Sequence, residues 1–367
     1  MRLKKPSRRQ VEDIFGIATR VLSLLLTVAA LLISHRSELV DAVSKKNGTV
    51  TEVGQPSRDE LLSGADEVMP ELRDMLLRNE YPLGLGIYDK LFTADTPPAP
   101  NGELQIVSTD LSKNALPEQV QIKNNTAFGV NVSSLLTVVG RELDGENVFD
   151  PDKPLVLIYH THGTEGYAEE GKTSYSPSSL PRSRDVTKNV VAVGTALCRI
   201  LNENGIPTVH CTTMFDDGSY NTAYSNSAKA IKEYLKKYPS IKYCFDVHRD
   251  ALVSETAVYK TVTYDESTPV AQIMFVVGTN EAGADHDSWR RCLSFAVNVQ
   301  YLLARRLNNL VRPISVKQSS YNQQYPYVGA LIEVGTCANS LKEALSSTEI
   351  LGRVLSAALK SDLALSE

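Results

Sequence analysis

The chain has 367 residues, of which 42% are hydrophobic and 22% are charged, and its formal net charge is -5. This composition is typical of a folded globular protein. The slightly acidic balance gives no whole-chain signature of nucleic-acid binding, so we predict no nucleic-acid partner. The length suffices for two ordinary domains, or for one large α/β domain with an anchor and a smaller module.

The N-terminus combines a basic tail with an apolar segment. The first ten residues, MRLKKPSRRQ, carry five basic groups and no acid, and residues 14–34 contain Arg20 as their one charge. A helix of this length spans roughly 30 Å, the thickness of a bilayer core. The segment lacks a small-x-small cleavage site, which favours an uncleaved anchor over a cleaved signal peptide. We predict a cytoplasmic tail at 1–13, a transmembrane helix at 14–34 and an exported body.

The next two regions differ in pattern. Residues 35–102 are polar, with helix-like patches and a Pro-rich end, which predicts a stalk or small helical region. Residues 103–150 alternate between apolar and polar side chains, which predicts a β-rich preface. The five cysteines form no CxxC pair, so we expect no disulfide framework.

Residues 151–367 alternate between strand and helix patterns. Apolar runs predict buried strands at 155–159, 206–211, 243–247, 272–277 and 328–334. Amphipathic segments predict helices at 185–205, 221–239 and 287–310, the first with Asp185 as its N-cap and Gly205 as its end. The region is therefore predicted to be an α/β domain with a largely parallel, doubly wound sheet flanked by helices.

Ionisable residues follow three of the predicted strands. YHTHGTE (residues 159–165), DVHRDA (246–251) and LIEVGTCANS (331–340) all lie at carboxyl ends. Sites in open α/β sheets form at these ends. We therefore expect His160 or His162 to meet His248 and Glu333.

Such a set suits a metal hydrolase. Catalytic zinc takes three protein ligands and leaves a position for water, while a nearby carboxylate serves as base and then acid. Asp246 and Asp250 flank His248 and are candidates to orient its ring. Arg249 is a candidate to stabilise an oxyanion or to bind a substrate carboxylate.

Structural interpretations remain open at this point. The sequence has no HExxH, Cys-rich zinc, GxSxG, P-loop or GxGxxG motif. A histidine at a strand end is often structural, as we expect of His35, His210 and His286, and Glu333 is alternatively a buried carboxylate paired to an arginine or a helix N-terminus. The tyrosines in GSYNTAYSNS and YNQQYPYVG either pack loops or line a groove for a saccharide or peptide.

Four segments together resemble the stage II sporulation protein P family and, more distantly, zinc-dependent N-acetylmuramoyl-L-alanine amidases. They are LVLIYHTHGTEGY, GSYNTAYSNSAKAIKEYLKKYPSIKYCFDVHRDA, FVVGTNEAGADHDSWRRCLSFAVNVQYLLARRL and YNQQYPYVGALIEVGTCANSLKEAL. The likeness runs from about residue 120 to 360. It implies an amidase-like fold for the catalytic domain.

The resemblance also implies roles for individual residues. His162 and His248 match the ligand histidines, and Glu333 matches the catalytic glutamate. The amidases carry a further ligand glutamate in a Glu-Lys-Asn run, where this chain has Thr187. Glu165 is the first candidate for that third ligand and Asp185 the second. His160 is expected to be either a ligand or a donor to one.

The family's activity gives the functional expectation. The resemblance implies a Zn²⁺-dependent peptidoglycan hydrolase that cleaves the amide between N-acetylmuramic acid and the stem peptide, with endopeptidase activity on peptide crosslinks. It implies a single-pass protein of the mother-cell septal membrane that faces the intermembrane space and thins the septal wall for forespore engulfment. Its partners would be a sporulation lytic transglycosylase and a membrane scaffold protein. The alternatives are a zinc carboxypeptidase or deacetylase and a non-catalytic wall-binding scaffold.

Overall fold

The structure, a computed structural model, describes residues 103–112, 120–139, 147–176 and 181–361. The predicted tail at 1–13, transmembrane helix at 14–34 and stalk at 35–102 lie outside the described residues. Among the residues that are described, no helix is long and apolar enough to cross a membrane. All of these residues belong to one compact unit.

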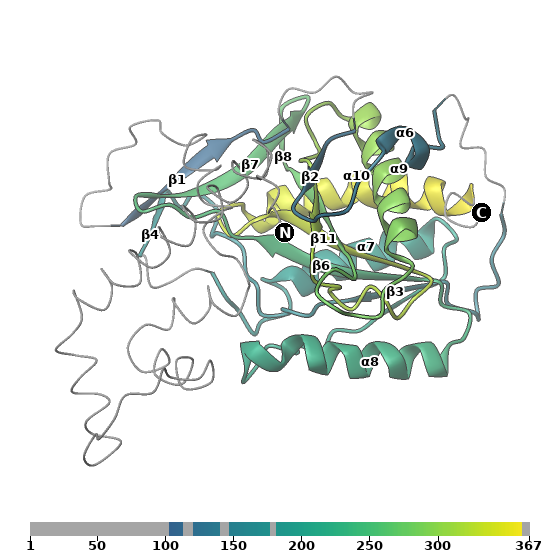
Figure 1. The fold of residues 1–367 in the computed structure, drawn as a ribbon. Coiled ribbons are helices and arrows are strands. Elements are labelled where there is room, and N and C mark those ends of the chain that lie inside the picture. The colour runs from purple at the N-terminus through teal and green to yellow at the C-terminus, as the bar shows by residue number, and fades with distance from the viewer. Residues whose placement is uncertain (1–102, 113–119, 140–146, 177–180, 362–367) are drawn as a thin grey trace, which may run out of the picture. The chain divides into compact units, whose positions relative to one another are not determined.

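Within the described residues, seven strands form a central sheet (Figure 1). In spatial order they are β2 (Ile122–Asn124), β10 (Ile314–Lys317), β9 (Ile273–Gly278), β11 (Val328–Thr336), β6 (Tyr243–Asp250), β3 (Val156–Tyr159) and β5 (Thr208–His210). All five apolar runs that predicted buried strands form strands of this sheet. The predicted α/β class is confirmed.

The sheet is mixed, so the prediction of a largely parallel sheet needs correction. The strands β11, β6, β3 and β5 are parallel to one another, as are β9, β10 and β2, but β11 and β9 are antiparallel. A parallel neighbour requires a crossover of a dozen or more residues, usually a helix. Only residues 318–327, which contain no helix, join β10 to β11. The chain therefore turns back, and β11 enters the sheet in the opposite direction.

A second sheet of the described residues has four strands. In spatial order they are β4 (Ser174–Tyr175), β1 (Leu104–Thr109), β7 (Ala257–Asp265) and β8 (Thr268–Ala271). A single residue, Gln272, separates β8 from β9 and so connects the two sheets. The region predicted as a β-rich preface contributes β1 to the second sheet, β2 to the central sheet, and the short helix α6 (Val132–Leu135).

In the described part of the chain, four long helices pack against the sheets. They are α7 (Val190–Glu203), α8 (Ala223–Lys237), α9 (Trp289–Arg306) and α10 (Leu341–Lys360). The predicted N-cap of α7 is wrong: Asn189 accepts the backbone N–H of Val191, whereas Asp185 accepts that of Thr187 in a separate turn. Polar side chains that close such local turns compete with helix starts. Gly205, with φ +75°, follows the end of the helix as predicted.

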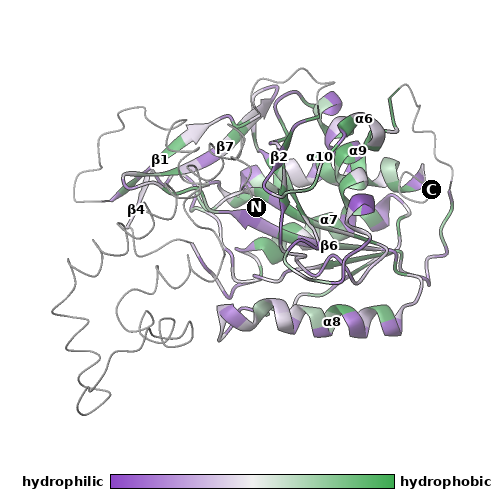
Figure 2. Ribbon diagram, in the orientation of Figure 1, coloured by the Kyte–Doolittle hydropathy of each residue, from purple (hydrophilic) through white to green (hydrophobic). Residues whose placement is uncertain are grey.

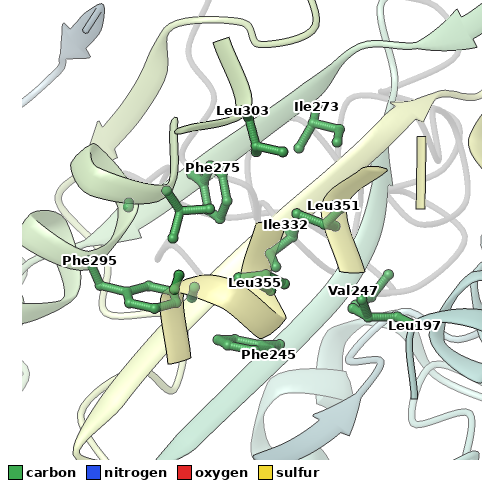
Figure 3. Close-up of a cluster of buried hydrophobic side chains, with 14 of the residues drawn as sticks. Leu197, Phe245, Val247, Ile273, Phe275, Phe295, Leu303, Ile332, Leu351 and Leu355 are labelled. Carbon is green, nitrogen blue, oxygen red and sulfur yellow. The ribbon is translucent and has the colours of Figure 1, made fainter. Parts of the chain in front are cut away.

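The helices cover both faces of the central sheet. Val156 and Ile158 of β3 belong to the main core with residues of α7, α9 and α10, whereas Leu157 packs in a separate cluster with Ile231 of α8. Successive residues of a strand point to opposite faces, so α8 lies across the sheet from the other three helices, and its apolar side faces the sheet (Figures 1 and 2). In the main core, side chains from β6, α9 and α10 interlock (Figure 3). This packing fixes the strand ends at which the predicted site residues lie.

Candidate metal centre

The predicted site residues come together at the ends of three strands. His162 and Glu165 follow β3, His248 lies in β6, and Glu333 lies in β11. The Cα atoms of Glu333 and His248 are partners in adjacent parallel strands. Paired residues project from the same face of a sheet, so these two side chains leave the sheet on the same side.

His162, Glu165 and His248 form a buried cluster of metal-ligand type. One ligand atom from each lies within 4.8 Å of the other two, and it is the one such group among the described residues. Nδ1 of His162 lies 3.6 Å from Oε1 of Glu165, and Nδ1 of His248 lies 3.2 Å from Oε2. Ligand atoms of a tetrahedral zinc ion are about 3.3 Å apart, given bonds of about 2.0–2.1 Å. The cluster therefore has both the donor atoms and the spacing of a zinc site.

The ring of His248 is oriented from its other side. Its Nε2 lies 2.9 Å from Oδ1 of Asp246, at ion-pair distance although not with the angle of a hydrogen bond. Asp246 is itself fixed, because it accepts the backbone N–H of Thr161 at 2.8 Å and its hydroxyl at 2.6 Å. A carboxylate behind the second ring nitrogen leaves Nδ1 toward the cluster, as in metal-ligating histidines generally.

Arg249 holds the loop that carries Glu165. Its backbone N–H donates to Oε2 of Glu165 at 3.2 Å, and its guanidinium donates to the carbonyls of Gly166 and Pro181, each at 3.0 Å. Neighbouring residues of a strand point to opposite faces, which directs the Arg249 side chain away from that of His248. Its contact with an oxyanion or a substrate carboxylate stays a prediction.

Aromatic rings surround His162. Tyr220, in the short helix η1 (Tyr220–Thr222), stacks on the imidazole with centroids 4.2 Å apart, and Tyr224 meets it edge-on at 5.5 Å. Nε2 of His162 is buried and has no hydrogen-bond partner among the described residues. These packed rings fix the plane of His162, and they place two tyrosines of the GSYNTAYSNS segment beside the cluster.

The three residues of the cluster shift one another's pKa values. Burial acts to raise the pKa of Glu165, but His248, His162 and Arg249 outweigh it and hold the pKa well below the usual range. Burial acts to lower the pKa of His248, but Asp246 and Glu165 raise it well above the usual range. Burial lowers the pKa of His162. A buried anion enclosed by imidazoles is a preformed environment for a cation.

The Glu333 carboxyl has the properties of a proton carrier. Its Oε2 is buried without a hydrogen-bond partner among the described residues, although the residue as a whole is partly exposed. Burial and the negative charge of Asp250 raise the pKa of Glu333 to about 8. A carboxyl that titrates near neutral pH can both accept and donate a proton during a reaction.

The chain is similar to known proteins in both sequence and fold. The model of the stage II sporulation protein P family matches residues 97–356 of the chain. The chain belongs to this family. The resemblance drawn from the sequence is thereby confirmed.

Individual relatives show how far the likeness extends. Stage II sporulation protein P of Bacillus subtilis (strain 168) is 28% identical over 205 residues, which are 52% of this chain and 48% of that protein. The chain thus matches about half the length of this relative. Among solved structures, the chain is similar to N-acetylmuramoyl-L-alanine amidase AmiC2 of Nostoc punctiforme, with 15% identity, a TM-score of 0.33, and coverage of 56% of this chain and 96% of that one. It is also similar to the catalytic domain of CwlV, an amidase from Bacillus (Paenibacillus) polymyxa var. colistinus, with 13% identity, a TM-score of 0.34, and coverage of 56% and 96%.

In this member of the family, His160 lies behind the cluster and outside it. Its Nδ1 lies 2.8 Å from the carbonyl of Val247, which can only accept, so Nδ1 carries the proton. Its Nε2 then accepts from Nε2 of His210 at 2.8 Å. Of the two predicted roles, ligand or donor to a ligand, the contact fits neither directly: His160 holds the carbonyl that precedes His248. His210, predicted to be structural, is its partner.

Two predicted aspartates lie elsewhere. Asp250 pairs with Arg312 at 2.6 Å instead of orienting His248, and the Arg312 side chain is almost fully buried. Asp185, the second candidate for the third ligand, lies outside the cluster and closes an exposed turn with Thr187. Of the two candidates for the third metal ligand, Glu165 lies in the cluster and Asp185 does not.

The sequence analysis missed a polar group beside Glu165. Asp216 accepts the backbone N–H and the hydroxyl of Thr164, and it pairs with Arg182 at 3.0 Å. These residues come from three separate loop positions, and no local motif links them.

Proposed function

We propose that this protein is a zinc-dependent N-acetylmuramoyl-L-alanine amidase that hydrolyses peptidoglycan. The observation that carries the proposal is the buried cluster of His162, Glu165 and His248, which lies beside a carboxyl, that of Glu333, with an uncommitted oxygen. Membership in the sporulation family supports a wall substrate. The proposal includes a second activity, the cleavage of peptide crosslinks between stem peptides.

The residues divide the work. His162 and His248 would hold the ion through imidazole nitrogens, and Glu165 would hold it through its carboxylate. When bound, Zn²⁺ supplies a Lewis acid for the amide carbonyl and lowers the pKa of water to about 7. The carboxylate of Asp246, 2.9 Å from Nε2 of His248, would favour a proton on Nε2 and so leave Nδ1 for the ion, and Arg249 keeps the loop of Glu165 in place.

Glu333 moves the proton. Its carboxylate accepts a proton from the attacking water while the new C–O bond forms, and it returns that proton to the amide nitrogen as the C–N bond breaks. The products are the free carboxyl group of the muramic acid and the free amine of the stem peptide. The raised pKa of Glu333 favours this exchange, because the proton is held and released close to neutral pH.

The setting of the activity belongs to the same proposal. We infer a single-pass membrane protein with a cytoplasmic N-terminus, whose catalytic part faces the space between mother cell and forespore. The basic tail and the apolar segment at 14–34 support this orientation. A lytic transglycosylase and a membrane scaffold would act beside it at the septum.

The test uses the full-length chain, purified in detergent, with zinc measured by elemental analysis and activity measured on isolated peptidoglycan. We expect about one zinc per chain in the wild type, in keeping with one ligand cluster. His162→Ala should lose both zinc and activity, whereas Glu333→Gln should keep zinc and lose activity. Glu255→Gln, at an exposed position beyond β6, is the matched control and should keep both.

Other outcomes identify the alternatives. Zinc without free stem peptides, but with shortened peptides or deacetylated sugars, would identify a carboxypeptidase or deacetylase. No zinc and an uncut wall, even with a transglycosylase added, would identify a wall-binding scaffold.

A further inference from the structure

The rim of the metal cluster carries an arginine that the proposed reaction does not use. Arg182 is paired with Glu165 in a short antiparallel bridge. Hydrogen bonds on either side of the bridge, from Gly166 N–H to the Pro181 carbonyl at 3.0 Å and from Ser183 N–H to the Thr164 carbonyl at 2.8 Å, fix the backbone. The position of Arg182 is therefore tied to that of a metal-ligand candidate.

The guanidinium of Arg182 is anchored at one nitrogen. Nη1 donates to the hydroxyl of Thr164 at 2.9 Å and to Oδ2 of Asp216 at 3.0 Å. Nε and Nη2 have no hydrogen-bond partner among the described residues, and the side chain is 40% exposed, whereas Asp216 is 1% exposed. The buried aspartate thus holds one corner of the fork and leaves the other donors for a ligand.

An aromatic layer joins this fork to the cluster. Cζ of Arg182 lies 5.3 Å from the ring centroid of Tyr220, which in turn stacks at 4.2 Å on His162. A guanidinium held over a ring keeps its plane, and its two-nitrogen fork matches a carboxylate better than a lysine does. The fork is therefore one aromatic ring away from the metal-ligand position.

We propose that Arg182 forms a carboxylate subsite that binds the stem peptide of the substrate. The proposal rests on the proposed amidase function. The carboxylate is that of the second stem residue, a glutamate linked through its side chain, which leaves its α-carboxylate free. The step from His162 across Tyr220 to Arg182 consists of contacts of 4.2 Å and 5.3 Å. Two extended residues span about 7 Å, so the step is longer than this by less than the length of one further residue. The subsite would prefer stem peptides with this carboxylate over those in which it is a carboxamide.

The test compares two synthetic muramyl pentapeptides that differ only in this carboxylate or carboxamide. Hydrolysis is measured with the zinc-loaded full-length wild type, Arg182→Lys and Arg182→Gln. Arg184→Gln is the matched control, since Arg184 lies in the same loop, is 78% exposed and pairs with Asp217 at 2.7 Å. Zinc content is measured in parallel for every variant.

We expect the wild type to prefer the carboxylate in kcat/KM by about 10-fold to 100-fold, the effect of one charged hydrogen-bonding group. Arg182→Gln should abolish the preference through KM, Arg182→Lys should reduce it, and Arg184→Gln should keep it. Zinc content should stay unchanged in Arg182→Lys, and the hydrolysis of the carboxamide peptide should stay unchanged in Arg184→Gln.

Three results would overturn the subsite. The first is a wild type without preference. The second is a preference that survives both changes at Arg182. The third is loss of zinc in both variants, which would make Arg182 a support for the loop of Glu165 only. A wild type that cleaves neither peptide would instead overturn the amidase function, and the subsite with it.

Discussion

The substitution Gly194→Ala tests whether the histidine pair behind the metal cluster is as rigid as its contacts indicate. Gly194 lies in α7, and a Cβ placed on it would approach Cε1 and Nε2 of His160 to 2.5 Å and Nε2 of His210 to 2.8 Å. The His160 ring has little room to yield, because Nδ1 is held by the carbonyl of Val247 and Nε2 by His210.

Two opposing effects set the magnitude. Alanine in place of a helical glycine stabilises the folded state by about 1 kcal/mol. The added methyl, however, is roughly 1 Å inside normal contact distance, and overpacking of this kind costs about 1–3 kcal/mol. Because the clash involves two rings that are both hydrogen-bonded, we expect the clash to dominate. The net loss in the free energy of unfolding should be about 1 kcal/mol.

The assay is urea unfolding followed by tryptophan fluorescence. The chain has one tryptophan, Trp289, which is buried in the same core as Leu197 of α7. Thr195→Ala is the control, since Thr195 is exposed on the same helix; it should change the free energy of unfolding by less than about 0.5 kcal/mol. Gly194→Ala should also weaken zinc binding, because the displaced His160 moves the carbonyl next to His248. A Gly194→Ala variant as stable as the wild type, with unchanged zinc affinity, would refute the reasoning.

Three further changes have defined outcomes. Burial lowers the pKa of His286 from 6.5 to about 4, so the unfolded chain takes up this proton first, and the stability present above pH 6.5 falls as the pH drops toward 4. Between pH 7 and pH 5, the free energy of unfolding should fall by about 2 kcal/mol less in His286→Gln than in the wild type, as measured by urea unfolding. An equal fall in both proteins would contradict this. Asp250→Ala leaves the buried Arg312 without its carboxylate and should destabilise by about 3 kcal/mol in the same assay, and a stable variant would show that other groups hold this arginine. Arg249→Met removes the donors that hold the loop of Glu165 and should weaken zinc binding by about 10-fold or more in a chelator competition, whereas unchanged affinity would show that the loop holds itself.

The sequence predicted the strands well where the signal is local. The apolar run before His160 must be buried on both faces, and β3 is 0–3% exposed along its length. Local pattern does not encode strand direction, however. The reversal of β11 relative to β9 depends on the short connection at 318–327, and the second sheet depends on the pairing of β7 with β1, which is distant in the sequence.

The candidate site shows the same limit. His162, His248 and Glu333 were predictable because carboxyl ends of strands meet at one edge of a sheet. The different roles of Asp246 and Asp250 were not predictable, because both flank His248 at the same spacing in the sequence. Asp246 contacts His248, whereas Asp250 pairs with Arg312, which is distant in the sequence. The pairing of His160 with His210 likewise depends on β5 lying beside β3.

The central claim is the bond that is cut, and mass spectrometry of the soluble products from isolated peptidoglycan tests it most directly. The zinc-loaded wild type should release stem peptides with a free N-terminal alanine, together with glycans whose muramic acid carries a free lactyl carboxyl group. Glu333→Gln, with the same zinc content, should release neither. Products in which the muramic acid amide stays intact throughout would contradict the account.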